Sequence, residues 1–256
     1  MALPFLGPDE DRTWTRAELA RRWELARETS PDDARGPRAL LLLNELTWIG
    51  EPVKRLFRKH DVTRAETPRS VMLLPGFGAH PIRMRYMARQ LEKAGHTVKR
   101  WGMGYNLGAT ADRFFKVEER LLDLFARRGE KIVLVGWSLG GVMARELAKR
   151  HPDKVAKVIT MGSPFSGSPR ANNGWRAYQA IAGHRVDEPE FEADPASKPP
   201  VETVALWSPL DGVVHPRSAC GKAEERDRAI AIRCSHMGFV YSEAAIDAVL
   251  GELETV

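Results

Sequence analysis

The feature that most constrains this chain is a short apolar run followed at once by a serine between glycines. Residues 132–135 read IVLV, which suits a strand buried in a parallel sheet, and residues 142–150 carry apolar side chains at helical spacing. The intervening GWSLG, residues 136–140, must turn the strand sharply into the helix. Glycine on both sides lets Ser138 take a strained backbone conformation and project its hydroxyl. This pattern predicts an exposed serine nucleophile beside the first free N–H groups of a helix.

Strands and helices alternate around this turn. The expected strands span residues 70–74, 97–101, 132–135, 157–161, 201–207 and 229–234. The expected helices span residues 15–29, 38–59 with a break near 50–52, 82–93, 111–128, 142–150, 175–182 and 243–253. Such alternation predicts an α/β fold with a mostly parallel central sheet and helices on both faces.

Two segments depart from the alternation. Residues 1–60 are expected to form an N-terminal helical extension ahead of a main domain at 61–256. Residues 165–200 are rich in Gly, Pro, Asn and charge, and long loops inside a compact domain are usually functional. We expect a lid over Ser138 there, although a surface excursion without a role has the same composition.

The segment 38–59 has two interpretations. Its apolar residues suit a helix that packs over the edge of the sheet. They also lie beside four basic residues, which is typical of a surface that touches lipid. The basic residues are Lys54, Arg55, Arg58 and Lys59.

An acid and a histidine follow the last two expected strands. Asp211 comes after strand 201–207 and precedes a glycine, and His236 comes directly after strand 229–234. The carboxyl ends of parallel strands meet at one edge of a sheet, so these side chains are expected near Ser138. Seven histidines are present, and His236 alone has this position after a terminal strand.

Five motifs together resemble the α/β-hydrolase superfamily, most of all its small bacterial esterase and lipase-like members. They read PGFG, GWSLGG, MGSPFSG, SPLDGVV and SHMGF, and the resemblance covers residues 70–253. It implies the α/β-hydrolase fold with a small lid insertion. The order serine, acid, histidine is the one this superfamily uses, so it implies Ser138 as nucleophile, His236 as base and Asp211 as its orienting carboxylate.

The resemblance also implies an oxyanion hole. The backbone N–H groups of Phe77 and Leu139 are the expected donors, because one follows the strand at 70–74 and the other follows the nucleophile. Many lipases have His-Gly where this chain has Pro75-Gly76, so the motif departs from that pattern here.

The expected chemistry is hydrolysis of a carboxylic ester through an acyl-serine, without a metal or an organic cofactor. An apolar substrate pocket is expected, and its predicted lining is Trp137, Phe165, Trp175, Tyr178 and Met237. Two alternatives stay open. An alcohol in place of water would make the chain an acyltransferase, and a hydrolase scaffold can also serve as a non-catalytic binding module.

Composition limits the partners and the location. The net charge of +5 is modest and the basic residues are scattered, which disfavours nucleic acid and leaves weak attraction to anionic membranes. The first residues show no secretory signal, and the longest apolar run is too short to span a bilayer. We therefore expect a cytoplasmic protein with, at most, peripheral membrane contact. The two cysteines, Cys220 and Cys234, are expected as free thiols, with a bridge as the alternative.

Overall fold

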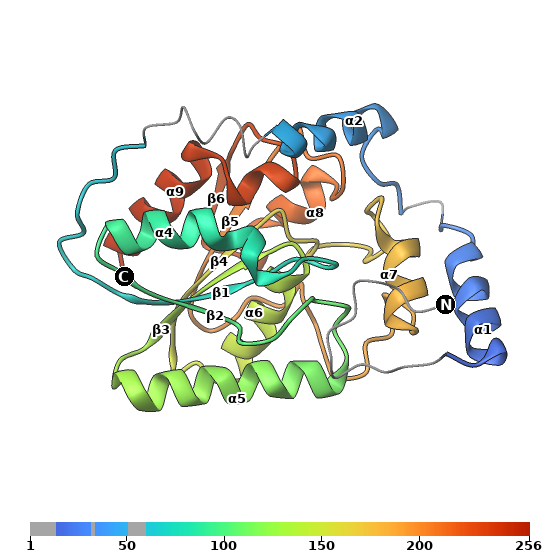
Figure 1. Cartoon of the computed structure of the whole chain (residues 1–256), viewed down its shortest axis with the longest axis horizontal. Coiled ribbons are helices and arrows are strands. Elements are labelled where there is room, and N and C mark those ends of the chain that lie inside the picture. The colour runs from blue at the N-terminus through green and yellow to red at the C-terminus, as the bar shows by residue number, and fades with distance from the viewer. Residues whose placement is uncertain (1–13, 32–33, 51–59) are drawn as a thin grey trace.

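The computed structural model describes residues 14–31, 34–50 and 60–256. Its centre is one six-stranded sheet in which every strand pairs in parallel, in the order β2-β1-β3-β4-β5-β6 (Figure 1). The strands are β1 (Ser70–Leu74), β2 (Thr97–Arg100), β3 (Ile132–Trp137), β4 (Val155–Met161), β5 (Glu202–Trp207) and β6 (Arg228–Ala231).

Helices cover both faces of this sheet, as predicted (Figure 1). On one face, α4 (Arg85–Lys93) and α9 (Glu243–Glu254) bury residues such as Met87, Leu91 and Val249. On the other face, α5 (Ala111–Arg128) and α6 (Leu139–Arg150) bury residues such as Phe114 and Leu147. The central strands β1 and β3 are buried along their whole length, because both of their faces are covered.

The order of the strands fixes where a ligand site can form. The chain runs from β1 outward to β2 and then crosses back to β3, from which it continues to β4, β5 and β6. The connection after β1 therefore leads toward one edge of the sheet, and the connection after β3 leads toward the other edge. In open α/β sheets, ligands bind in the crevice beyond the carboxyl ends of the strands at such a switch point.

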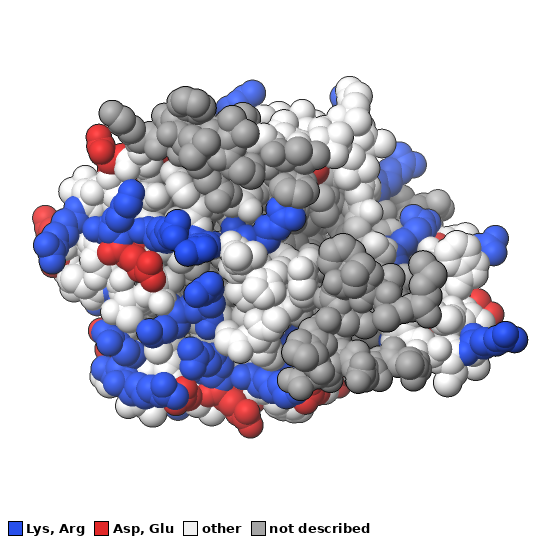
Figure 2. Space-filling view, in the orientation of Figure 1, with Lys and Arg blue, Asp and Glu red and all other residues white. Residues whose placement is uncertain are grey.

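The edge strand β2 lies in a basic surface. Lys and Arg side chains gather over α4, β2 and α5 on the face shown in Figure 2. Lys99 and Arg100 on β2 are exposed. Charged side chains on an edge strand discourage pairing with another chain.

The expected helical segment at 38–59 is present over residues 39–50, but only one turn of it is α-helix. The elements are η1 (Ala39–Leu41) and η2 (Leu46–Gly50), both 3-10 helices, and α2 (Leu42–Glu45) between them. Residues 51–59 lie outside the described part. The expected strand at 229–234 also ends early, at Ala231, because Cys234 turns its N–H to Ser208 Oγ and leaves the sheet.

The first helix packs on the predicted lid segment. Helix α1 (Arg16–Arg27) lies beside α7 (Trp175–Ala182), at one end of the molecule in Figure 1. The guanidinium of Arg22 donates to the carbonyls of Ala180 and Ile181 at 3.0 and 2.6 Å. The N-terminal residues thus contact the 165–200 segment, while the domain division at residue 60 stays a prediction.

Candidate active site

Ser138 is the single residue between the end of β3 at Trp137 and the start of α6 at Leu139. Its backbone has φ +54° and ψ −123°, and within residues 14–31, 34–50 and 60–256 no other residue except glycine has a positive φ. A non-glycine residue in this region is strained and persists only where its surroundings enforce it. The predicted strand-turn-helix geometry around Ser138 is therefore present.

The glycines of the turn are required by close packing. A Cβ on Gly140 would lie 2.2 Å from the carbonyl oxygen of Leu74, and one on Gly136 would lie 2.4 Å from the carbonyl oxygen of Gly140. Both distances are far below van der Waals contact, and the opposing atoms are backbone. The chain can therefore bring α6 against β1 and β3 only where these positions lack a side chain.

Asp211 and His236 meet at the carboxyl ends of β5 and β6. The Oδ2 atom of Asp211 lies 2.8 Å from Nδ1 of His236. Its other oxygen, Oδ1, accepts the N–H groups of Val213 and Val214, each at 2.8 Å. Asp211 is fully buried, so the carboxylate is fixed and faces the imidazole.

The environment of His236 favours its charged form. Burial by itself lowers the pKa of this imidazole, but the adjacent Asp211 carboxylate and, more weakly, the Glu45 carboxylate raise it above its ordinary value. The net effect is a raised pKa of His236. A base held this way gains affinity for the proton that it would take from a nucleophile.

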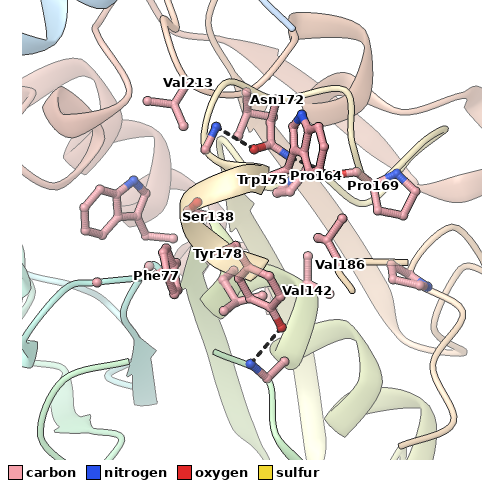
Figure 3. A pocket seen from close by; sticks show the side chains of 18 of the residues that line it. Phe77, Ser138, Val142, Pro164, Pro169, Asn172, Trp175, Tyr178, Val186 and Val213 are labelled. Atoms are coloured by element: carbon pink, nitrogen blue, oxygen red, sulfur yellow. Dashed lines mark hydrogen bonds between the residues drawn. The ribbon is translucent and has the colours of Figure 1, made fainter. Parts of the chain in front are cut away.

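A cavity of about 370 Å³ lies beside the nucleophile turn (Figure 3). Both Ser138 and His236 line it, and most of its wall is apolar. Of the predicted lining residues, Trp137, Trp175, Tyr178 and Met237 are present.

The predicted position of Phe165 differs from the structure. Phe165 does not line this cavity, whereas its neighbour Pro164 does. The Phe165 ring instead packs under the guanidinium of Arg145, 4.1 Å from the ring centroid, and both side chains are buried. A cation over an aromatic face out of water is a favourable pair, which explains this inward orientation.

The loop after β1 abuts the nucleophile turn. A Cβ on Gly76 would lie 3.1 Å from Cβ of Ser138, and both Phe77 and Leu139 line the cavity. The Phe77 ring packs on Tyr178 with 5.1 Å between centroids. This places the two predicted oxyanion donors beside Ser138.

Three polar residues that the sequence analysis did not select hold these loops. Asn106, fully buried, donates to the carbonyl of Pro75 at 2.8 Å and fixes the loop that carries Phe77.

The other two residues, Ser208 and Glu45, hold the Asp211 and His236 loops. Ser208 donates to the carbonyl of Cys234 at 2.5 Å and connects the Asp211 loop to the His236 loop. Glu45 accepts N–H groups from both of those loops. Nothing in the local sequence marks these residues, because their partners are far away along the chain.

The two cysteines are free thiols in the structure, as expected. Burial, together with the nearby Asp211 and Glu45 carboxylates, raises the pKa of the Cys234 thiol, which therefore stays neutral. In the described part of the chain, no group of three His, Cys, Asp or Glu side chains is arranged to hold a metal ion.

Comparison with known proteins agrees with this fold. A family model described as alpha/beta hydrolase fold matches residues 119–226. The pimeloyl-(acyl-carrier protein) methyl ester esterase of Aliivibrio salmonicida is 37% identical over 87 residues, which are 33% of this chain and 31% of that protein. The enzyme of the same name from Vibrio vulnificus is 30% identical over 124 residues, which are 47% of this chain and 46% of that protein. The chain thus spans about a third to a half of the length of these curated relatives.

A solved structure extends the likeness over most of the fold. The monoacylglycerol lipase of Paleococcus ferrophilus superposes with a TM-score of 0.51 at 16% identity, covering 76% of this chain and 96% of that one. At this identity the likeness concerns the fold alone. The parallel sheet and the matched family model together show that the chain has the α/β-hydrolase fold.

Proposed function

We propose that this protein is a serine hydrolase that cleaves carboxylic esters through an acyl-serine intermediate. The observation that carries the proposal is the shared cavity. Ser138, on its strained turn, and His236, held at 2.8 Å by Asp211, open into the same apolar space. A hydroxyl needs a positioned base to act as a nucleophile at neutral pH, and a serine and a histidine that line one cavity support such a pair.

In this proposal His236 takes the proton of Ser138 as the hydroxyl attacks the ester carbonyl. Asp211 holds the imidazole in the required tautomer and stabilises the imidazolium. The N–H groups of Phe77 and Leu139 hold the oxyanion, a contribution of about 3 kcal/mol per donor in a comparable protease. His236 then returns the proton to the leaving alcohol and activates water to release the acid.

The apolar wall favours an acyl chain as the bound group. Aromatic and aliphatic side chains such as Trp175, Tyr178, Val142 and Val213 surround Ser138 (Figure 3). The curated relatives are named as esterases of a carrier-bound acyl methyl ester, which is consistent with an ester of an acyl chain. We therefore propose an uncharged acyl ester as the substrate class, and no observation favours acyl transfer or pure binding.

The segment 165–200 is proposed as the cover of this cavity. Its helix α7 contributes Trp175 and Tyr178 to the wall, and Tyr178 OH accepts the N–H of Ala109 at 3.1 Å (Figure 3). Burial raises the pKa of Tyr178 to about 12, so this hydroxyl stays protonated. An apolar cover of this kind keeps bulk water from the acyl-serine until hydrolysis.

Weak membrane contact through residues 38–59 also stays a proposal. In the described residues no helix has the length and apolar character needed to cross a bilayer. Exposed leucines at the surface support a peripheral contact, since large apolar side chains in water are otherwise unfavourable. They are Leu40, Leu42, Leu43 and Leu46. The basic residues 54–59 lie outside the described part.

The experiment that tests the hydrolase proposal is labelling by a fluorophosphonate followed by mass spectrometry of the digested protein. An activated serine reacts, and we expect the label on Ser138 alone. Ser138→Ala should abolish both the labelling and the hydrolysis of short aryl esters, with a fall in kcat of about 10⁴-fold or more. An unlabelled Ser138 in the folded wild type, or undiminished turnover by the variant, would refute the proposal.

A further inference from the structure

We propose that Glu45, from the N-terminal segment, is a positioning residue for the Asp211–His236 pair. This inference rests on the proposed function and adds a residue to its site. Glu45 ends α2, a helix of four residues outside the region that the resemblance covers. Its side chain is 8% exposed although its neighbours Asn44 and Leu46 are exposed, so it points inward from a surface turn.

The Glu45 carboxylate bridges two loops that the chain separates widely. Its Oε1 atom accepts the N–H of Gly212 at 2.9 Å and the N–H of His236 at 2.8 Å. Its Oε2 atom accepts the N–H of Met237 at 2.8 Å. Gly212 follows the acid directly, and His236 is the base itself. One carboxylate therefore sets the distance between the backbones that carry the two side chains.

The fit of Gly212 against the N-terminal segment supports this role. A Cβ on Gly212 would lie 2.4 Å from the carbonyl oxygen of Leu41, so the turn before Glu45 lies directly on the Asp211 loop. Ionised acceptors make shorter and stronger hydrogen bonds than neutral ones, and three such bonds from one buried group hold both loops firmly. A shift of about 1 Å in a catalytic group can lower a rate about 100-fold.

The charge of Glu45 also acts on the base. Two carboxylates raise the pKa of His236, Asp211 by direct contact with the imidazole and Glu45 from its place at the backbone N–H of His236. Cys234, whose thiol lies near both carboxylates, stays neutral because burial and these two charges raise its pKa. Removal of the Glu45 charge alone should therefore lower the pKa of His236.

Two variants separate the bridge from the charge. Glu45→Ala removes all three hydrogen bonds, and we expect kcat to fall about 10- to 100-fold. KM should change by less than about twofold, because Glu45 does not line the cavity. Glu45→Gln keeps one acceptor oxygen for Gly212 and His236 but loses the charge. Its kcat should fall less, while the pKa of His236 should be lower than in the wild type.

The matched control is Glu225, a second buried carboxylate that accepts a backbone N–H. Its Oε2 atom lies 2.7 Å from the N–H of Lys222, and it is 7% exposed, but it is absent from the cavity wall. Glu225→Ala and Glu225→Gln should lower thermal stability without changing kcat per folded molecule or the pKa of His236.

The deciding measurement is the pKa of His236, obtained by NMR titration of its imidazole signal, which is assigned with a His236→Gln variant. A purely structural role of Glu45 would leave this pKa unchanged. A lowered His236 pKa in folded Glu45→Gln supports the proposal, and an unchanged value overturns it. Wild-type kcat in folded Glu45→Ala also overturns it. If Glu45→Ala does not fold, Glu45→Gln decides. A wild type that neither hydrolyses esters nor labels at Ser138 refutes the hydrolase function, while the titration still tests Glu45.

Discussion

The nucleophile turn and the acid–base pair of this protein are built in different ways. Ser138 is fixed by its immediate neighbours in sequence, since Gly136 and Gly140 allow the contact of α6 with β3 and β1. Asp211 and His236 lie 25 residues apart on two loops, and distant groups hold them, including a carboxylate 191 residues away from His236. The nucleophile is therefore encoded locally, and the geometry of its base depends on tertiary contacts.

Substitutions in the serine turn and in the acid–base loops should therefore have different effects. A change within the serine turn meets backbone atoms that cannot move, so it should affect folding as well as activity. A change among the contacts of the two loops alters distances or charge and leaves the sheet intact, so it should affect activity more than stability.

The largest effect on stability is expected from Gly140→Ala in the serine turn. The new Cβ would meet the Leu74 carbonyl at 2.2 Å, and we expect a loss of at least about 3 kcal/mol in the free energy of unfolding, measured in urea. The matched control is Gly251→Ala in α9, where nothing lies within 4 Å of the new Cβ. That substitution should stabilise the protein by about 0.5–1 kcal/mol. Equal stability of the two variants would contradict the claim that close packing excludes a side chain at Gly140.

Asp211→Asn should act on the base and spare the fold. The amide oxygen can still accept the N–H groups of Val213 and Val214, but the imidazole loses its anionic partner. The same change in a serine protease lowers kcat about 10⁴-fold, and we expect a loss of this order in ester hydrolysis. Asp227→Asn is the control, because Asp227 also accepts a backbone N–H, from Thr203 at 2.8 Å, away from the cavity. Wild-type turnover by Asp211→Asn would exclude Asp211 as the orienting acid.

The pH profile should reflect the raised pKa of His236. The base must be neutral to accept a proton, and a raised pKa keeps it protonated to higher pH. Activity should therefore fall on the acid side with a midpoint above the ordinary value of about 6.5. The measurement is kcat/KM for a neutral aryl ester across pH 5–9. A midpoint at or below the ordinary value would contradict the geometry of two carboxylates around His236.

The smallest effect is expected on the outer side of the segment that carries Glu45. Leu40 and Leu43 are 75% and 62% exposed. Replacement of both by serine should weaken binding to anionic liposomes in a sedimentation assay by a few-fold and leave kcat unchanged. Replacement of exposed Ile82, on another part of the surface, is the control. Unchanged liposome binding by the double variant would contradict the membrane contact and leave only the proposed role of Glu45 at the Asp211 and His236 loops.

The predicted elements agree with the structure where a pattern repeats locally. The helices at 111–128 and 175–182 have the predicted bounds, since helical spacing and a glycine just after the last turn occur together in both sequences. Over residues 39–50 the predicted helical segment is present, but only Leu42–Glu45 is α-helical and the rest is 3-10 helix, in a segment whose Glu45 bonds to the Asp211 loop. Tertiary contacts override propensity there.

The site residues divide along the same line. Ser138, Asp211 and His236 could be selected from the sequence, because each follows a strand of a parallel sheet and such strands end at one edge. Phe165 could not be placed, since its preference for Arg145 over the cavity depends on a helix formed elsewhere in the chain. The sequence by itself determined the sheet, the glycine-flanked turn and the order of serine, acid and histidine, because those depend on neighbours in the chain. Only the tertiary structure decided that Glu45, Asn106 and Ser208 hold the loops of this site, because a buried polar group finds its partners in space and leaves no periodic pattern in the sequence.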